Sequence, residues 1–470
     1  MKTLRTYQNN IVEATDRFLL TTTDIAGQVY SPTGSGKTEC FLHTIKRVLD
    51  RAAAEDANAR IAILHPRIAL SQDQLSRFVG VLRNATYTSF HSGGHVIRED
   101  EEVLEKHTTN VEELERIATN CGRSHITFSS YDSFTKLVGI EFDLIIFDEA
   151  HNLMQDQFRS IIEDHSANKA LLFTATPIHS EDEEIAGMDN PGVFGDVIAQ
   201  VLPSALFPHG YMVPPMIHNM ACTIDEVQGV VDPVHAVADA FTYQASEMTK
   251  TGMPFTQMLV ASRGISDMEQ VNQRLVELWE RLGKNVAVYT VTADTHLRNG
   301  VPMNSRKELL DDAKNSQDDA IIMHYDTLAE GIDISTITGV FPMRNLSKFK
   351  LMQTIGRSSR PYVADLNDRG EVVDMVTRKK QFGVVTFPTV NGVPLNNIQS
   401  SEWVAAFASA GYGDIADFYN PATTTALPNS DDDLNLGEDE DPMMNAIVDS
   451  ELTRDTQYLL IGSSLLALGS

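Results

Sequence analysis

The stretch QVYSPTGSGKT at residues 28–38 decides the fold, because a short β-rich run leads into a glycine loop and then into a helical pattern. Gly34 and Gly36 let the backbone curl so that its N–H groups point inward, and the start of the helix adds a positive end. Such a loop suits the phosphates of a nucleotide, with Lys37 at the β and γ phosphates and the Thr38 hydroxyl on Mg²⁺. The first position of the general pattern GxxxxGK[ST] holds serine here, so a glycine turn with a chance Lys-Thr pair is the weaker alternative.

The run LIIFDEAH at residues 144–151 supplies the carboxylates that such a loop needs. Four apolar residues predict a buried strand, and Asp148 and Glu149 follow at its carboxyl end, where open α/β sheets bind their ligands. Asp148 is expected to hold the Mg²⁺ shell, and Glu149 to polarise the attacking water as general base. An acidic pair can also cap a helix start without any catalysis, but its pairing with the upstream loop argues against that alternative.

Short β-rich runs alternate with longer polar-periodic stretches, as parallel strands covered by helices would. The sequence therefore predicts an α/β fold with two tandem parallel-sheet domains, at residues 1–215 and 216–393. The join is expected at 207–217, where three prolines and a glycine break any regular element. Acid-rich stretches at 95–116 and 179–192 are expected to be solvated helices or loops. The predicted strands are QVY (28–30), IAILH (61–65), HITFSS (125–130), DLIIFD (143–148), ALLFTAT (170–176), QMLVAS (257–262), NVAVYTV (285–291), AIIMHY (320–325), GVFPM (339–343) and FGVVTF (382–387).

The alternation of β-rich runs and helical stretches stops in residues 394–470, where we expect a short helical segment, an acidic linker and an apolar tail. Seven carboxylates and no base lie between Asp431 and Asp441. The simple interpretation is a solvated linker with a short helix that docks on a protein partner. A sharper hypothesis is that the acidic cluster imitates a polyanion and occupies a strand-binding groove. Trp403 and Phe407 lie at helical spacing and indicate a packing face.

Composition limits the classes of partner. With 37 Lys plus Arg against 65 Asp plus Glu, the net charge of −28 repels nucleic acid and anionic lipid over most of the surface. A bound polyanion therefore needs a local cationic groove. The three cysteines are far apart and form no CxxC pair, which argues against a disulfide framework or a structural zinc site. The pair of histidines in FHSGGH at 90–95 is expected to lie in a glycine-rich loop rather than to bind a metal. No signal peptide or membrane-spanning run is apparent, so the prediction is a cytoplasmic protein, in the host cytoplasm if the source is a virus.

Further motifs give the chain a family resemblance. LRTYQ at 4–8, HPR at 65–67, SSYDS at 129–133 and TAT at 174–176 join the two elements above. TLAEGIDI at 327–334 and QTIGRSSRP at 353–361 follow in the second domain. In this order the motifs resemble those of the superfamily-two helicases and translocases with a DEAH box. The opening motif, HPR and GYMVPP look most like the branch of restriction-enzyme helicase subunits and phage DNA-repair helicases. Thr6 replaces the proline common in the opening motif, and no nuclease-like cluster is visible.

The resemblance implies two RecA-like domains that use ATP and Mg²⁺. It implies that Arg357 and Arg360 act as arginine fingers, which neutralise charge on the γ-phosphate during transfer, and that Gln353 couples to His151 and the nucleotide. The residues expected to bind the nucleotide are Tyr7, Gln8, Thr33, Gly34, Ser35, Gly36, Lys37, Thr38, Gly331 and Asp333, and those expected to contact nucleic acid are Arg67, Ser129, Tyr131, Ser262, Arg263 and Thr327.

The function expected from these residues is an ATP-dependent helicase or translocase that couples ATP hydrolysis at the cleft between its domains to movement on nucleic acid. DNA is favoured over RNA, because the branch resemblance points to DNA and the long accessory region of DEAH RNA helicases is missing. One alternative is an RNA helicase, and another is an ATP-gated clamp or remodelling switch that does not unwind. A third is an inactive structural relative, which the intact Lys37, Glu149, Arg357 and Arg360 oppose.

Overall fold

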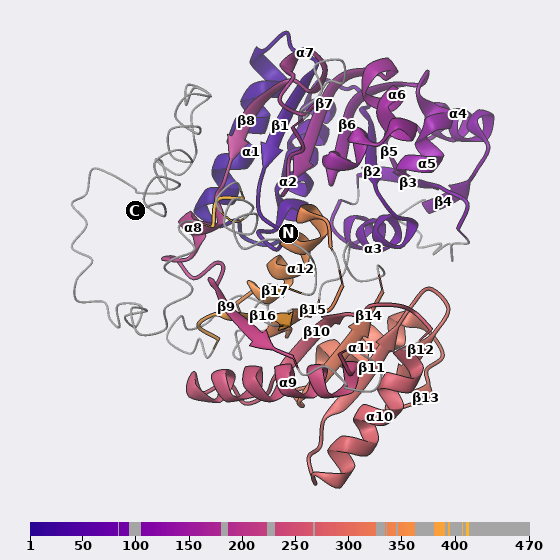
Figure 1. The fold of residues 1–470 in the computed structure, drawn as a ribbon. Helices are drawn as coiled ribbons and strands as arrows, with labels where there is room; N and C mark the ends of the chain where they lie inside the picture. Colours follow the sequence, from indigo (N-terminus) through magenta and orange to yellow (C-terminus); the bar gives the residue numbers. More distant parts are fainter. Residues whose placement is uncertain are drawn as a thin grey trace, which may run out of the picture. The chain divides into compact units, whose positions relative to one another are not determined.

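The computed structural model describes residues 1–82, 84–93, 105–179, 187–222, 231–266, 268–325, 334, 336–344, 346–361, 380–390, 393–394, 407 and 410–412. These residues form two compact units, and the chain passes from the first to the second between Val201 and Leu202. Each unit is a β-sheet with helices packed along it, as Figure 1 shows. Both sheets are largely parallel and covered by helices, so the predicted α/β class with two tandem sheet domains is confirmed. The domain limits at residues 215 and 393 stay a prediction.

The first unit contains eight strands among its described residues, in the order β4-β3-β5-β2-β6-β7-β1-β8. All seven pairs of neighbours are parallel. The central strands read as continuous apolar runs because both faces of a parallel sheet are covered by helices. The strands are β1 (Ala26–Tyr30), β2 (Arg60–His65), β3 (Ala85–Phe90), β4 (Glu105–Thr108), β5 (Ser124–Ser130), β6 (Glu141–Asp148), β7 (Ser166–Thr174) and β8 (Asp196–Gln200).

The order of these strands creates the edge where a ligand can bind. β7 lies between β1 and β6, so the loop after β1 and the acidic pair after β6 come from strands with a single strand between them. β2 lies on the other side of β6. Because all of these strands are parallel, their carboxyl ends meet at one edge of the sheet.

Helices of the first unit connect the strands, and their apolar faces are buried in the unit. In α2 (Lys37–Ala54), Phe41, Ile45 and Leu49 recur at helical spacing and are buried. The others are α1 (Thr6–Thr21), α3 (Ile68–Val79), α4 (Val111–Asn120), α5 (Tyr131–Phe134), α6 (Asp156–Asp164) and α7 (Pro191–Phe194), with 3₁₀ turns at Thr135–Leu137 and Ala150–Met154.

The second unit contains nine strands among its described residues, in the order β13-β12-β11-β14-β10-β15-β16-β17, with β9 also paired to β16. The central pairs are parallel, whereas β12, β13 and β17 pair antiparallel at the edges. The strands are β9 (Pro215–Ala221), β10 (Gln257–Ala261), β11 (Ala287–Val291), β12 (His296–Arg298), β13 (Val301–Pro302), β14 (Ala320–His324), β15 (Gly339–Pro342), β16 (Gly383–Val390) and β17 (Val393–Pro394), and the helices are α8 (Pro203–Leu206), α9 (Pro233–Lys250), α10 (Met268–Arg281), α11 (Arg306–Asn315) and α12 (Lys348–Ser358).

Each of the ten predicted β runs overlaps an observed strand, but two predictions about the segments between them were wrong. The join at 207–217 was expected to contain no regular element, yet β9 starts at Pro215 and pairs with β16 along its whole length. Proline is tolerated as the first residue of a strand. Within 95–116, Glu105–Thr108 forms β4 rather than a helix or loop, because it pairs with β3.

Three further observations concern the predictions about membranes, thiols and the end of the chain. Among the described residues, no helix is long and apolar enough to span a bilayer. The three cysteines are free thiols. Phe407 is buried in the core of the second unit, whereas Trp403, the acidic cluster and the apolar tail lie outside the described residues.

Candidate active site

The glycine loop after β1 is folded tightly on itself. Ser35 closes it by donating from its hydroxyl to Pro32 O at 2.7 Å, and its Oγ lies 2.6 Å from the Oγ of Ser31. Ser31 N donates to Thr174 O at 2.9 Å, which joins the loop to the end of β7. Gly34 and Gly36 have φ values of 86° and 87°, a conformation that favours glycine.

The opening motif of the sequence holds this loop from behind. Gln8 donates from Nε2 to Ser35 O at 2.9 Å, and Tyr7 donates from its hydroxyl to the same carbonyl. A Cβ at position 36 would lie 2.4 Å from Gln8 Nε2, so the α1 side chain packs where only glycine fits. Both Tyr7 and Gln8 are buried. The structure therefore places these two residues as supports of the loop backbone, and their predicted contact with the nucleotide stays a prediction.

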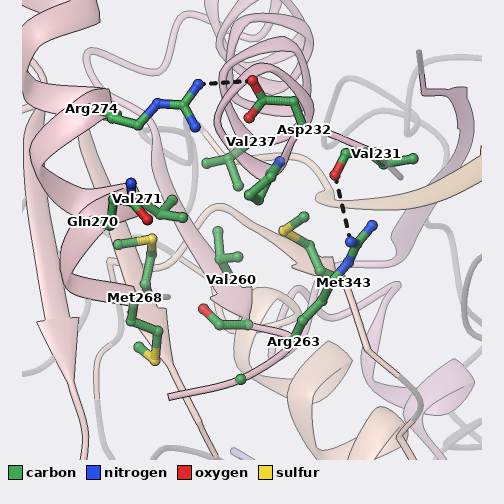
Figure 2. Close-up of a pocket in the computed structure, with 14 residues that line it drawn as sticks. Val231, Asp232, Val237, Val260, Arg263, Met268, Gln270, Val271, Arg274 and Met343 are labelled. Carbon is green, nitrogen blue, oxygen red and sulfur yellow. Dashed lines mark hydrogen bonds and ion pairs between the residues drawn. The ribbon is translucent and has the colours of Figure 1, made fainter. Parts of the chain in front are cut away.

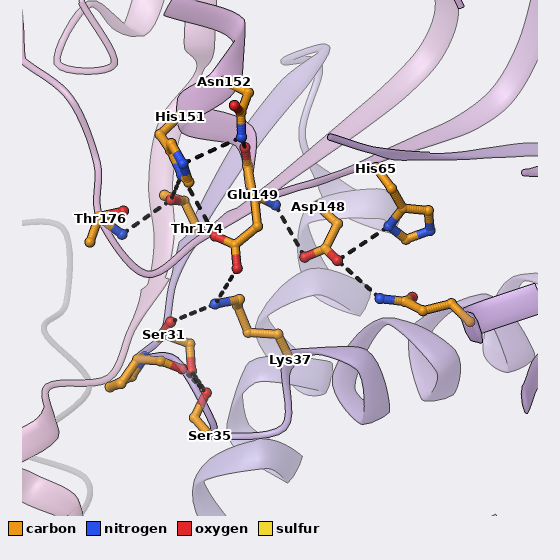
Figure 3. A network of polar contacts seen from close by, with 12 residues as sticks. Ser31, Ser35, Lys37, His65, Asp148, Glu149, His151, Asn152, Thr174 and Thr176 are labelled. Carbon is orange, nitrogen blue, oxygen red and sulfur yellow. Dashed lines mark hydrogen bonds and ion pairs between the residues drawn. The ribbon is translucent and has the colours of Figure 1, made fainter. Parts of the chain in front are cut away.

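Lys37 is the first residue of α2 and reaches back over the loop. Its Nζ donates to Ser31 O at 3.3 Å and lies 3.6 Å from Glu149 Oε1 (Figure 3). The Glu149 backbone has a φ of 51°, which is uncommon for a residue with a side chain. Such strain is held in place by its surroundings and is concentrated at functional sites. Lys37 and Glu149, predicted from separate motifs, are thus brought together.

Asp148 receives hydrogen bonds from three elements. Gln74 of α3 donates from Nε2 to Oδ2 at 3.0 Å, His65 Nδ1 lies 3.3 Å from the same oxygen, and Glu149 N donates to Oδ1 at 3.1 Å. Burial alone would raise the pKa of Asp148, but the His65 hydrogen bond and charge, the Lys37 charge and the Gln74 bond hold that pKa below its ordinary value. The group is therefore a carboxylate, the form that binds a hard cation.

A second chain of contacts runs from Glu149 to the end of β7. His151 Nδ1 lies 3.6 Å from Glu149 Oε2 and 3.0 Å from Thr174 Oγ1. Thr176 N donates to Thr174 Oγ1 at 3.1 Å. Asn152 Nδ2 donates to Glu149 O at 2.9 Å and lies 3.3 Å from His151 Nε2. Figure 3 shows that these side chains form one continuous polar network with Lys37. The DEAH and TAT motifs are therefore physically connected.

The residues present fit ATP with a divalent cation. The loop ends at a helix start, Lys37 is held beside it, and a carboxylate and a hydroxyl are available from Asp148 and Thr38. No group of three or more His, Cys, Asp or Glu side chains that could hold a metal on its own is found in the described part of the chain. A cation here would thus depend on substrate phosphates for part of its coordination, as Mg²⁺ commonly does.

Two of the residues that were predicted to contact nucleic acid lie in the core of the first unit. Ser129 is fully buried and donates from Oγ to Phe90 O at 2.8 Å. Tyr131 is fully buried and donates from its hydroxyl to Asp148 O at 2.9 Å. In this conformation neither side chain is available to a bound polymer. Arg67, by contrast, is partly exposed at the start of α3.

The remaining residues predicted to belong to the site are in the second part of the sequence. Gln353, Arg357 and Arg360 lie on α12 and just beyond its end; the first two are buried and Arg360 is partly exposed. Ser262 and Arg263 follow β10. Thr327, Gly331 and Asp333 lie outside the described residues.

The carboxyl end of α12 is firmly anchored. Lys380 is fully buried, and its Nζ donates to Arg360 O at 2.7 Å and to Ile337 O at 2.6 Å. Val213 N donates to Ser359 O at 2.9 Å. The backbone that carries the two arginines is therefore held by Lys380, just before β16, and by the segment before β9.

Three site residues escaped the sequence reasoning. His65 was noted only as part of the HPR motif, but it binds Asp148; its position at the end of β2, a strand beside β6, is the signal that could have suggested this. Gln74 and Lys380 carry no motif signal, because their bonds depend on tertiary packing.

Comparisons with known proteins agree with this geometry. Residues 1–179 match the family described as "Type III restriction enzyme, res subunit". This match covers less than half of the chain, and it relates the amino-terminal part to the res subunits of restriction enzymes. The resemblance predicted from the motifs is thereby confirmed, although the phage branch stays a prediction. No curated protein sequence matches the chain.

Solved structures share the fold over almost the whole chain. The ATP-dependent type ISP restriction-modification enzyme LlaBIII bound to DNA has a TM-score of 0.61 at 17% identity and covers 89% of this chain. A nuclease-deletion mutant of the type ISP enzyme LlaGI in complex with a DNA substrate mimic has a TM-score of 0.57 at 17% identity and covers 87%. The chain spans only 30% and 29% of the length of these enzymes. They therefore establish its fold, and activities of the larger proteins are not transferred by the likeness alone.

Proposed function

We propose that the chain is an ATP-driven helicase or translocase that acts on DNA. The single observation that carries this proposal is the convergence of Lys37 and Glu149, 3.6 Å apart, beside the buried carboxylate of Asp148. Lysine, catalytic carboxylate and metal-binding carboxylate are the groups that phosphoryl transfer needs from a glycine-loop ATPase. The relationship to restriction-enzyme subunits and the DNA in both similar structures support DNA as the polymer.

In the proposed reaction, Lys37 and the loop N–H groups bind the phosphates of ATP, and Thr38 and Asp148 hold Mg²⁺. The cation would supply neutralisation of the phosphate charge. Glu149 accepts the proton of the attacking water as general base. His151 and Asn152 orient Glu149 through the contacts described above. Thr174, at the end of β7, contacts His151, so a change in the charge or contacts of Glu149 would be passed through His151 to β7.

The second unit is proposed to complete the reaction. Arg357 and Arg360 neutralise charge in the transition state, and Gln353 couples the nucleotide to the DEAH segment. Binding of ATP would favour one arrangement of the two units, and hydrolysis would remove that preference. A ligand shifts such an equilibrium because its affinities for the two arrangements differ. The support is the order of the motifs and the fixed α12 terminus. A cytoplasmic location and a protein partner for the acidic tail are further predictions.

The experiment that tests the proposal is the ATPase rate with single-stranded DNA, duplex DNA, branched DNA and RNA in parallel. We expect DNA to stimulate turnover more than RNA. Lys37→Ala and Arg360→Ala should both lose nearly all turnover, with nucleotide affinity falling more in Lys37→Ala. Arg281→Gln, an exposed arginine at the end of α10, is the matched control. Normal hydrolysis by Arg360→Ala would remove that residue from the assignment.

Strand-displacement and triplex-displacement assays then distinguish a helicase or translocase from the ATP-gated clamp. Displacement of a third strand without unwinding supports a translocase, and displacement of a paired strand supports a helicase. DNA-stimulated ATPase with neither product would favour the ATP-gated clamp instead.

A further inference from the structure

A pocket of about 340 Å³ lies in the second unit, at the carboxyl ends of β10, β14 and β15 (Figure 2). Its volume falls in the range of small-molecule sites. One side is apolar and is formed by Val260, Met268, Met323 and Met343. The other side is polar and includes the loop after β10. This composition suits a ligand that has a flat apolar part and a charged part.

The polar side carries an uncompensated positive charge. Arg263 is exposed, its Nη1 is 3.5 Å from Val231 O, and no carboxylate pairs with it among the residues that the structure describes. Arg274, the other arginine of the pocket, is 2.9 Å from Asp232 Oδ2 and is neutralised there (Figure 2). The charge of Arg263 is thus available to an anion.

A hydroxyl beside this arginine also lines the pocket. Ser262 is only 8% exposed and lines the pocket, and its N–H donates to His324 O at 2.9 Å. No hydrogen bond of its hydroxyl is found in the described part of the structure. Its Oγ is not one of the buried, unpartnered oxygens of the described structure and so keeps contact with solvent, where an oxygen of a ligand in the pocket can accept a hydrogen bond from it. α10 also begins at the pocket, with Met268, and its amino-terminal end attracts negative charge.

The apolar side is suited to an aromatic ring. Three of its side chains are methionines, which are flexible and polarisable and make favourable sulfur contacts with aromatic rings. Met268, Met323 and Met343 are all buried, so a ring that enters the pocket would contact them without exposing them further. A nucleotide carries both an anionic group and an aromatic ring, so it matches the two kinds of side chain that line this pocket.

We propose that this pocket takes one unstacked nucleotide of the bound DNA strand, with its phosphate on Ser262 and Arg263 and its base against the methionines. The inference rests on the proposed function and goes beyond it, because contacts with the backbone alone would not require a base. Arg263 and Ser262, which were predicted to contact nucleic acid, would hold the strand at a position where the presence of a base is sensed.

The test compares a labelled oligodeoxythymidylate with a strand of the same length in which the bases are replaced by abasic units. For the full chain we expect the intact strand to bind about tenfold more tightly. Val271→Phe, which fills the pocket from α10, should abolish that preference and leave affinity for the abasic strand unchanged. Arg263→Gln should lower the affinity for both the intact and the abasic strand. Arg281→Gln is the control, since it removes the same charge about 20 Å away along α10.

Equal affinity of the wild-type chain for the intact and abasic strands would overturn the inference, as would a preference that survives in Val271→Phe. The wild-type comparison needs no variant and so does not depend on folding. If Val271→Phe lowers the melting temperature, Gln270→Trp, at the exposed mouth of the pocket, replaces it. Failure of every strand to bind would instead contradict the proposed function itself, whereas tight binding of both strands alike would contradict only the pocket.

Discussion

Lys37 Nζ and Glu149 Oε1 lie 3.6 Å apart, although 111 residues lie between the two in the sequence. Both side chains are largely buried, at 9% and 16% exposed. A buried charge needs a partner, and here each residue supplies the other's. The lysine therefore has to exchange a carboxylate for phosphate oxygens when a nucleotide binds.

Replacing Glu149 with glutamine should separate nucleotide binding from hydrolysis. The amide cannot accept a proton, so we expect kcat to fall by about 10²- to 10⁴-fold. ATP affinity should stay the same or rise, because Lys37 is released from its carboxylate partner. Steady-state ATPase and nucleotide binding by fluorescence measure the two effects. Glu163→Gln removes an exposed carboxylate of α6 as a control, and an equal loss of kcat in both variants would argue against the general base.

Adding a methyl group at Gly36 should disable the loop. Its φ of 87° costs a residue with a side chain about 1–2 kcal/mol, and the new Cβ would meet Gln8 Nε2 at 2.4 Å. Gly36→Ala is therefore expected to lower the melting temperature and to lose nucleotide binding. Gly139→Ala is the matched control, since nothing lies within 4 Å of a Cβ there. Similar melting temperatures and nucleotide affinities for the two variants would contradict this account of the loop.

The stability of the protein should fall between pH 6.5 and pH 4 because of His125. Burial, together with the charges of Arg60 and Lys106, lowers the pKa of His125 from 6.5 to about 4. The unfolded chain binds a proton in this window and the folded chain does not, so acid favours unfolding. The difference corresponds to about 3 kcal/mol at pH 4, and none above pH 6.5.

His125→Gln should flatten this part of the pH profile, because glutamine never takes up the proton. Urea unfolding midpoints at pH 7.5, 6.0, 5.0 and 4.5 measure the slope for both proteins. A slope that is the same in the variant and the wild type would show that other groups determine the acid sensitivity.

The strands that position the site could be predicted, because β1, β2 and β6 are buried on both faces and read as apolar runs. β8 and β9 were missed, since β8 has only three apolar residues in a row and His218 and Asn219 interrupt β9, and pairing with β1 and β16 makes them strands. The same limit applies to the site. The loop and the DEAH segment were recognised from local motifs, but the contact of His65 with Asp148 arises from the neighbouring positions of β2 and β6.

Removal of the buried lysine in the second unit should affect both stability and turnover. Lys380 Nζ donates to Ile337 O and Arg360 O, and burial with the charge of Arg360 lowers the pKa of Lys380 well below its ordinary value. In Lys380→Met the two carbonyls lose their donor, which costs about 1–3 kcal/mol for each buried group left unpaired. The end of α12 is then held less firmly, and Arg360 with it.

We therefore expect Lys380→Met to lower the melting temperature and kcat while nucleotide affinity, which the first unit supplies in the proposed function, stays close to wild type. Calorimetry, steady-state ATPase and nucleotide binding measure the three quantities. Lys307→Met, an exposed lysine of α11, controls for the loss of one positive charge. A variant that melts earlier but keeps full kcat would make Lys380 a support of the fold only, because the position of Arg360 would then be set by the remaining contacts of α12.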